Sequence, residues 1–236
     1  MKYIYKPKSA LEKFGVKVYR LLVENFPQTF FVGGMVRDFL LKRKVTDIDI
    51  ATHANPDNVI KILSDANINI AADNKKFGSI TARQGNMAIE ITTFRKDLKS
   101  SGRYPKVSFI GNPKTDSQRR DFTINSIYLR LKNNQIFDFQ KGLKDIHLRQ
   151  IKFIGNPAKR IGEDPLRIIR ALRFALVLNF KLEKKTKQAI KNNFAAIKFL
   201  TKTKIQKEIG KVSKEKNKKT LQKVINSPKM LDKYFK

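Results

Sequence analysis

The chain has 236 residues and carries 51 lysines and arginines against 20 aspartates and glutamates, which gives a formal net charge of +31. It contains no cysteine, which excludes disulfides, thiolate nucleophiles and cysteine-rich zinc sites, and its two histidines are too far apart in sequence to indicate a histidine-centred site. The charge favours a polyanionic partner such as nucleic acid, although an AT-rich source genome would also raise the lysine content.

The first part of the chain predicts a mixed sheet flanked by helices. Apolar residues at helical spacing from Leu11 to Leu22 predict an amphipathic first helix and not a signal peptide. The elements expected next are a buried strand at 29–32, a helix at 35–42, a strand at 47–51, a helix at about 55–64, and a hairpin of 79–83 with 87–93.

The rest of the chain changes from this mixed pattern to a helical one. Residues 96–104 are polar and predict a mobile loop before a strand at 107–110, and helices are expected at 164–178 and 183–192. The change in composition predicts two domains, 1–145 and 146–236. Because the sequence has no apolar run long enough to cross a bilayer, we expect a soluble, cytoplasmic protein without a membrane partner. The sequence leaves the oligomeric state open.

The most informative stretch combines a glycine turn with two carboxylates. Gly33 and Gly34 follow an apolar run and let phosphate oxygens approach backbone N–H groups at a helix N-terminus, and Arg37 adds a forked donor one turn later. If 47–51 is a strand, Asp47 and Asp49 lie on one face, where they suit a hard divalent cation such as magnesium held together with substrate phosphates. The pattern therefore predicts a site for a nucleoside triphosphate.

Each part of this pattern has a simpler alternative. Gly33-Gly34 is also compatible with a plain strand-to-helix turn in which Arg37 pairs with Asp38. An Asp-x-Asp sequence alone is usually a solvated turn, because short motifs match often by chance. The combination, and not either motif, favours the nucleotide site.

A second charged row lies at the start of the expected helix 164–178. Asp164, Arg167, Arg170 and Arg173 recur every three residues, so that neighbours adjoin while the row drifts around the helix. An intrahelical ladder of salt bridges is the usual explanation of such spacing. Three arginines against one aspartate nevertheless leave positive charge uncompensated.

Five blocks of sequence together resemble the class II tRNA nucleotidyltransferases, or CCA-adding enzymes, and the bacterial poly(A) polymerases. The blocks are GGMVRD at 33–38, TDIDIAT at 46–52, EITTFR at 90–95, RRDFTINSI at 119–127, and the stretch from EDPLR to RALRF at 163–174. The resemblance covers about residues 28–180. It implies an α+β fold, with a polymerase-beta-like nucleotidyltransferase head followed by an all-helical neck. The sequence itself predicts a lysine-rich helical C-terminus after the neck.

The resemblance also implies roles for individual residues. Asp47 and Asp49 would hold Mg²⁺, Gly34 and Arg37 would contact the triphosphate, and Glu90 would assist the primer hydroxyl or a metal, unless it is simply an exposed strand residue. Arg120 would contact the nucleotide and Asp121 the sugar hydroxyls, with a capped helix start as the alternative for Asp121. Asp164 and Arg167 would read the pairing edge of the base, with Arg170 and Arg173 on the triphosphate side.

The function implied is addition of C, C and A to the tRNA 3′ end from CTP and ATP without a nucleic-acid template, with release of pyrophosphate. A poly(A) polymerase, or a partial enzyme that adds only CC or only A, is the near alternative. A non-catalytic basic RNA-binding protein is the alternative from another class.

Two departures from the family are visible. The loop 96–105 is short and lacks the acidic residues usual there, which puts the final A-adding step in question. The chain resembles a C-terminally shortened member, and we hypothesise that its lysine-rich end replaces the missing domains with diffuse phosphate contacts. A solvated helix face is the alternative.

Overall fold

The computed structural model describes residues 3–98, 107–109 and 111–235, and the chain divides into two compact units. The first comprises Met1–Arg120 and Asn125–Gly142, and the second comprises Asp121–Ile124 and Leu143–Lys236. The tetrapeptide Asp121–Ile124 joins the second unit because Phe122 stacks on Phe153 at a ring distance of 4.9 Å and meets Phe174 edge-on at 5.5 Å.

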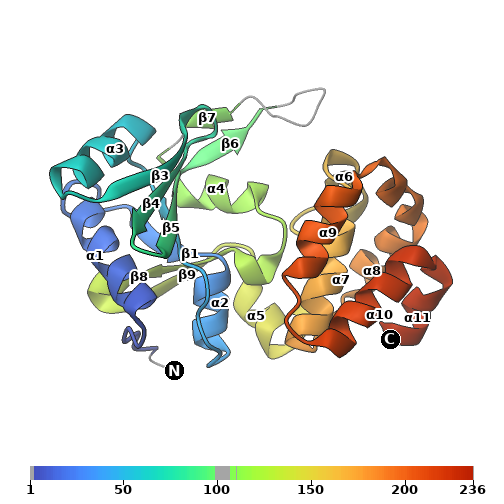
Figure 1. Ribbon diagram of the computed structural model, residues 1–236. Helices are drawn as coiled ribbons and strands as arrows, with labels where there is room; N and C mark the ends of the chain where they lie inside the picture. Colours follow the sequence, from blue (N-terminus) through green and yellow to red (C-terminus); the bar gives the residue numbers. More distant parts are fainter. Residues whose placement is uncertain (1–2, 99–106, 110, 236) are drawn as a thin grey trace. The chain divides into compact units, whose positions relative to one another are not determined.

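The first unit is built on a seven-stranded mixed sheet in the order β3-β4-β5-β2-β1-β8-β9, in which only β2 and β5 run parallel. Its strands are β1 (Thr29–Val32), β2 (Asp49–Thr52), β3 (Asn69–Asn74), β4 (Ser79–Gln84), β5 (Met87–Thr93), β8 (Ile127–Arg130) and β9 (Gln135–Asp138). Its helices are α1 (Ala10–Asn25), α2 (Gly34–Leu40), α3 (Pro56–Asp65) and α4 (Pro113–Arg119), and β6 (Arg95–Asp97) and β7 (Val107–Phe109) form a separate antiparallel pair. Figure 1 shows this sheet with α1 and α3 beside it.

Strand β1 is buried on both faces, and its side chains alternate between two aromatic layers. Phe31 stacks on Tyr19 of α1 at 5.1 Å, whereas Phe30 and Val32 pack in a cluster with Phe94 and Tyr128. Such two-sided burial explains why β1 reads as a continuous apolar run. The loop at Gly33 therefore follows a strand that is packed on both faces.

Most elements predicted in this unit are confirmed, with shifted ends. Strand β1 and the β4–β5 hairpin lie where the pattern indicated, and α1 begins after Ser9 with a capping box to Glu12. The prediction that 47–51 is a strand is wrong at its start, because β2 begins at Asp49. Residues 96–97, the start of the predicted loop 96–104, belong to strand β6, and residues 99–104 lie outside the described residues.

The described residues of the second unit form helices, one short parallel ladder and an isolated antiparallel bridge between Phe122 and Phe153. Its elements are α5 (Gly142–His147), β10 (Gln150–Ile151), α6 (Pro157–Glu163), α7 (Leu166–Leu178), β11 (Lys181–Leu182), α8 (Lys184–Asn192), α9 (Lys202–Gly210), α10 (Glu215–Asn226) and α11 (Leu231–Tyr234). Helix α7 is central: it packs on α6, α9 and α10, and most of its apolar residues are buried (Figure 1). A mixed sheet with flanking helices followed by helices is the fold class that the sequence predicts, and it is confirmed.

Within the part of the chain that the structure describes, no helix is both long and apolar enough to span a membrane.

Candidate active site

Asp49 interacts electrostatically with two other carboxylates, those of Asp47 and Glu90, where β2 begins. Asp49 is the first residue of β2 and lies opposite Glu90 of the parallel neighbour β5, and the Glu90 N–H donates to the carbonyl oxygen of Ile48 at 3.1 Å. Asp47 precedes the strand and is exposed, whereas Ile48 and Ile50 are buried. The predicted alternation of acids and isoleucines is therefore confirmed, although Asp47 is not part of the strand.

The environment of Asp49 disfavours its negative charge. Burial, together with the charges of Glu90 and Asp47, raises the pKa of Asp49 from 3.8 to about 7, although Arg120 and Arg37 act in the opposite direction. Glu90 is exposed and accepts a hydrogen bond from the Ser79 hydroxyl at 2.7 Å. A carboxylate repelled by two others is one that a bound cation would stabilise.

Gly33 allows the Asp49 carboxylate to lie against the backbone. Gly33 has φ +78° and ψ −142°, and a Cβ there would stand 2.5 Å from Oδ2 of Asp49. Positive φ and this close approach both require a residue without a side chain. The absence of a side chain at Gly33 therefore creates the room that the Asp49 carboxylate occupies.

Arg37 is held by protein groups in the structure. Its Nε and Nη2 donate to the two Asp38 oxygens at 3.0 and 2.8 Å, and its Nη1 donates to Oδ1 of Asn125 at 2.6 Å. The pairing with Asp38, which sequence reasoning rejected, is therefore present. A Cβ at Gly34 would lie 3.4 Å from Nη2 of Arg37, so this turn and the guanidinium are neighbours.

Arg120 is oriented by two residues that sequence reasoning missed. Asp116 is fully buried and accepts hydrogen bonds from Arg120, from Arg119 and, at 2.7 Å, from the Tyr128 hydroxyl. The same hydroxyl accepts from Nε of Arg120 at 3.0 Å. Asp116 is a positioning residue for an arginine whose charge reaches Asp49.

Replacing Asp116 with asparagine should lower the free energy of unfolding by about 2 kcal/mol at pH 7, because two arginines lose a buried charged partner. Burial alone would raise the pKa of Asp116, but Arg120 and Arg119 hold it below its ordinary value of 3.8. This stabilisation is therefore present above about pH 4 and is lost as the pH falls further. Urea unfolding at pH 7 and at about pH 2.5 checks this: the difference from wild type should shrink at the lower pH, and Glu24→Gln, which changes an exposed acid, should show no difference at either pH.

The other predicted site residues belong to the second unit, where most are ion-paired. Arg170 donates to Oδ2 of Asp121, with Nε at 2.8 Å, and Arg173 donates through Nε to Glu208 at 2.8 Å. Arg167 pairs with Glu163 at 2.7 Å. The prediction that these arginines leave positive charge uncompensated is wrong, since their acidic partners lie outside the row.

Asp164 lies just before α7, in an extended conformation, and not on the helix. Its Oδ1 accepts from the N–H of Leu166 at 3.0 Å, so it caps the first turn. The alternative interpretation, a ladder of salt bridges within this row, is therefore also wrong. Asp121 accepts from the N–H of Phe122 at 2.8 Å and, despite burial, its contact with Arg170 holds its pKa below the ordinary value.

The residues present fit a divalent cation that is completed by substrate. Among the described residues, no group of three or more His, Cys, Asp or Glu side chains is arranged to enclose a metal ion. Divalent cations such as magnesium are commonly bound by one or two carboxylates together with substrate phosphates, so Asp47 and Asp49 are the residues here that could hold such an ion. The mutual repulsion at Asp49 supports this fit.

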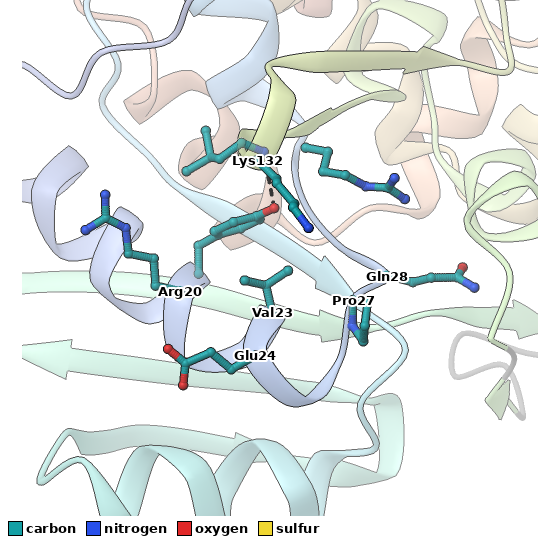
Figure 2. A pocket seen from close by; sticks show the side chains of 9 residues that line it. Arg20, Val23, Glu24, Pro27, Gln28 and Lys132 are labelled. Carbon is teal, nitrogen blue, oxygen red and sulfur yellow. Dashed lines mark hydrogen bonds between the residues drawn. The ribbon is translucent and has the colours of Figure 1, made fainter.

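A cavity of about 740 Å³ lies elsewhere in the first unit, between the C-terminal part of α1 and the turn that follows β8. Figure 2 shows Arg20, Glu24, Gln28 and Lys132 around it, and its Tyr19 hydroxyl accepts from the N–H of Leu131 at 3.2 Å. None of the predicted site residues lines this cavity. The candidate site is defined by its carboxylates and glycine turn.

Comparison with known proteins bears on both units. Residues 29–152 match the Poly A polymerase head domain family. A CCA-adding enzyme from Staphylococcus saprophyticus is 42% identical over 188 residues, which are 79% of this chain and 46% of the relative. One from Lactobacillus helveticus is 41% identical over 190 residues, with 78% and 46% covered. The chain thus spans about half the length of these curated relatives.

Solved structures agree with the sequence matches. The CCA-adding enzyme of Bacillus stearothermophilus in complex with CTP is 32% identical with a TM-score of 0.76, over 87% of this chain and 49% of that chain. A tRNA nucleotidyltransferase complexed with a primer tRNA and an incoming ATP analog is 27% identical with a TM-score of 0.70, over 91% and 61%. The resemblance that the five sequence blocks indicated is confirmed.

Proposed function

The chain belongs to the Poly A polymerase head domain family, and we propose that it adds C, C and A to the 3′ end of tRNA, with CTP and ATP as substrates and pyrophosphate as product. The observation that carries the proposal is the carboxylate group at Asp49, set against the bare backbone of Gly33 and repelled by Asp47 and Glu90. That arrangement suits a triphosphate that arrives with divalent cations. The cytoplasm, where tRNA is available, is the proposed location.

In the proposed reaction the 3′-hydroxyl oxygen of the RNA attacks the α-phosphorus. A new P–O bond forms, the bond to the β-phosphate oxygen breaks, and pyrophosphate leaves in line. Asp47 and Asp49 would hold Mg²⁺, which when bound neutralises charge on the triphosphate and lowers the pKa of the attacking hydroxyl. We assign to Glu90 the acceptance of the hydroxyl proton, because its exposed carboxylate lies one strand from Asp49.

The glycine turn and the nearby arginines would bind the nucleotide. Gly33 is the N-cap of α2 and Gly34 is its first residue, so their backbone N–H groups lie at a helix N-terminus. Arg37 and Arg120 are held in fixed orientations by buried acids. Fixed donors reduce the reorganisation needed when charge develops on the phosphates.

In the second unit we propose that Asp164 and Arg167 read the base. The Asp164 carboxylate accepts and the Arg167 guanidinium donates, so together they offer an amide-like hydrogen-bonding pattern. This pattern matches cytosine and, after a small rotation, adenine. Arg170 and Arg173 would act on the triphosphate side and Asp121 on the sugar hydroxyls. Arg170 pairs with Asp121 in the structure, so each of these two side chains would contact both the other and the substrate.

The test uses a tRNA transcript that lacks its last three nucleotides, with Mg²⁺ and with CTP, ATP or both. The proposal expects extension by two nucleotides with CTP alone and by three with both, and release of one pyrophosphate per addition. Omitting the divalent cation should stop the reaction. Failure to extend under any nucleotide mixture would contradict the proposal and favour a non-catalytic RNA-binding protein.

A poly(A) polymerase is the second candidate, favoured by the description of the family that matches residues 29–152. The same assay separates the two, since that enzyme would use ATP alone and produce a long A tail. Extension that stops after CC, or that needs a CC-ending acceptor and ATP, would indicate a partial enzyme.

A further inference from the structure

The aromatic side chain of Phe199, in the second unit, is mostly exposed although the apolar side chains of Phe194 and Ile197 nearby in sequence are buried. Phe199 is the last residue of the 3₁₀-helix Phe194–Phe199, and 77% of it is exposed, the largest value among the exposed large apolar side chains of the described chain. With three residues per turn, Phe194 and Ile197 face inward and are buried, so Phe199 lies on the outer side. Its ring does not support the core.

The surroundings of this ring are positively charged. The Lys198 ammonium lies 5.2 Å from the centre of the Phe199 ring, and Lys202, also exposed, begins α9. Between Glu183 and Glu208 the sequence contains no acidic residue, and Glu208 itself is buried against Arg173 and Lys211. A negatively charged partner with a flat apolar group would complement the exposed ring and the lysines beside it.

We propose that Lys198, Phe199 and Lys202, here called the Phe199 surface, bind unpaired RNA, with the ring stacked on a base and the two ammonium groups on phosphates. An aromatic ring flanked by cations is the arrangement with which proteins hold single-stranded nucleic acid without reading its sequence. A protein partner would instead require acids that complement the lysines and an apolar patch larger than one ring. The inference rests on the proposed function, because it assigns a contact for the RNA substrate.

Because the chain has no tryptophan, Phe199→Trp introduces a single fluorescent indole at the proposed contact. Titration with a single-stranded RNA oligonucleotide, or with a tRNA transcript lacking its last three nucleotides, should quench this indole as a base stacks on it. The matched control is Leu148→Trp, at another exposed apolar position of the same unit, which is 43% exposed. Equal quenching at both positions would overturn the proposal.

Affinity measurements separate the ring from the lysines. Phe199→Ala should weaken RNA binding about 5- to 100-fold at every salt concentration, because stacking is uncharged. The double variant Lys198→Gln/Lys202→Gln should instead lower the slope of log affinity against log salt by about 1.4, since each phosphate contact on a single strand contributes about 0.7. Phe199→Tyr should restore most of the affinity that alanine loses, which a merely structural defect would not allow.

The outcomes also separate this inference from the proposed function. Binding is measured without nucleotides, so if the wild-type chain extends tRNA but Phe199→Ala binds RNA normally, only the inference falls. If Phe199-dependent binding is found but no extension, the proposed function fails and the surface stands as an RNA contact. A dimer in sedimentation velocity that Phe199→Ala abolishes, with unchanged RNA affinity, would show that Phe199 contacts a second copy and would overturn the proposal.

Discussion

Replacing Asp49 with asparagine is expected to lower the rate of nucleotide addition roughly 10³-fold and, at the same time, to raise the melting temperature of the ligand-free protein. The rate falls because the amide cannot supply the charge that the proposed cation needs beside the triphosphate. Asparagine keeps nearly the same volume, so the space beside Gly33 stays filled. Single-turnover incorporation from CTP measures the first effect, and thermal unfolding in the presence of a chelator measures the second.

The gain in stability follows from the charge at this position. Because the folded protein raises the pKa of Asp49 to about 7, it binds more protons at this group than the unfolded chain between about pH 4 and pH 7. Ionisation of Asp49 therefore lowers the free energy of unfolding as the pH rises from about 4 to about 7. The loss is absent at low pH and complete above about pH 7. The melting temperature of Asp49→Asn should exceed that of wild type most at pH 8 and less at pH 5.5.

Asp65→Asn is the matched control, since Asp65 is an exposed carboxylate at the end of α3, outside the site. It should change neither the rate nor the melting temperature. If the Asp49→Asn variant keeps the wild-type rate of incorporation, the Asp49 carboxylate has no role in the proposed chemistry. A lowered melting temperature would show that Asp49 stabilises the fold through contacts and is not repelled.

The parts of the site that sequence reasoning predicted are those set by local geometry. Alternation of acids and isoleucines at 47–50 indicated which side chains leave the core, and that depends only on the period of a strand. The partners of Arg170 and Arg173 escaped prediction because they are distant in sequence: Asp121 is 49 residues from Arg170, and Glu208 is 35 from Arg173. Spacing within one helix therefore overstated the free positive charge.

The fold shows the same division. Strand β1 and the β4–β5 hairpin carry strong local signals, whereas β3 is exposed along most of its length and shows no alternation of apolar residues. Strands β8 and β9 were not predicted either, although β8 pairs with β1 and supplies Tyr128 to the Asp116 group. Their place in the sheet is decided by pairing with distant strands, which a single sequence does not display.

Gly33→Ala is expected to lower nucleotide addition at least 100-fold and to destabilise the first unit by roughly 2 kcal/mol. The added Cβ would stand 2.5 Å from Oδ2 of Asp49, and φ +78° with ψ −142° is a conformation that alanine rarely adopts. Relief of the contact must displace either the Asp49 carboxylate or the turn, and both lie at the reacting phosphates in the proposed reaction. Incorporation assays and urea unfolding measure the two effects.

Gly34→Ala separates the effect of position from that of a lost glycine. A Cβ at Gly34 would meet only the tip of Arg37 at 3.4 Å, an ordinary contact, and Gly34 is the first residue of α2, where alanine favours the helix. Its free energy of unfolding should match wild type or exceed it. If Gly33→Ala and Gly34→Ala are equally stable and equally active, the close approach of Asp49 to the Gly33 backbone has no functional role. The Asp49 carboxylate would then not require a residue without a side chain at position 33.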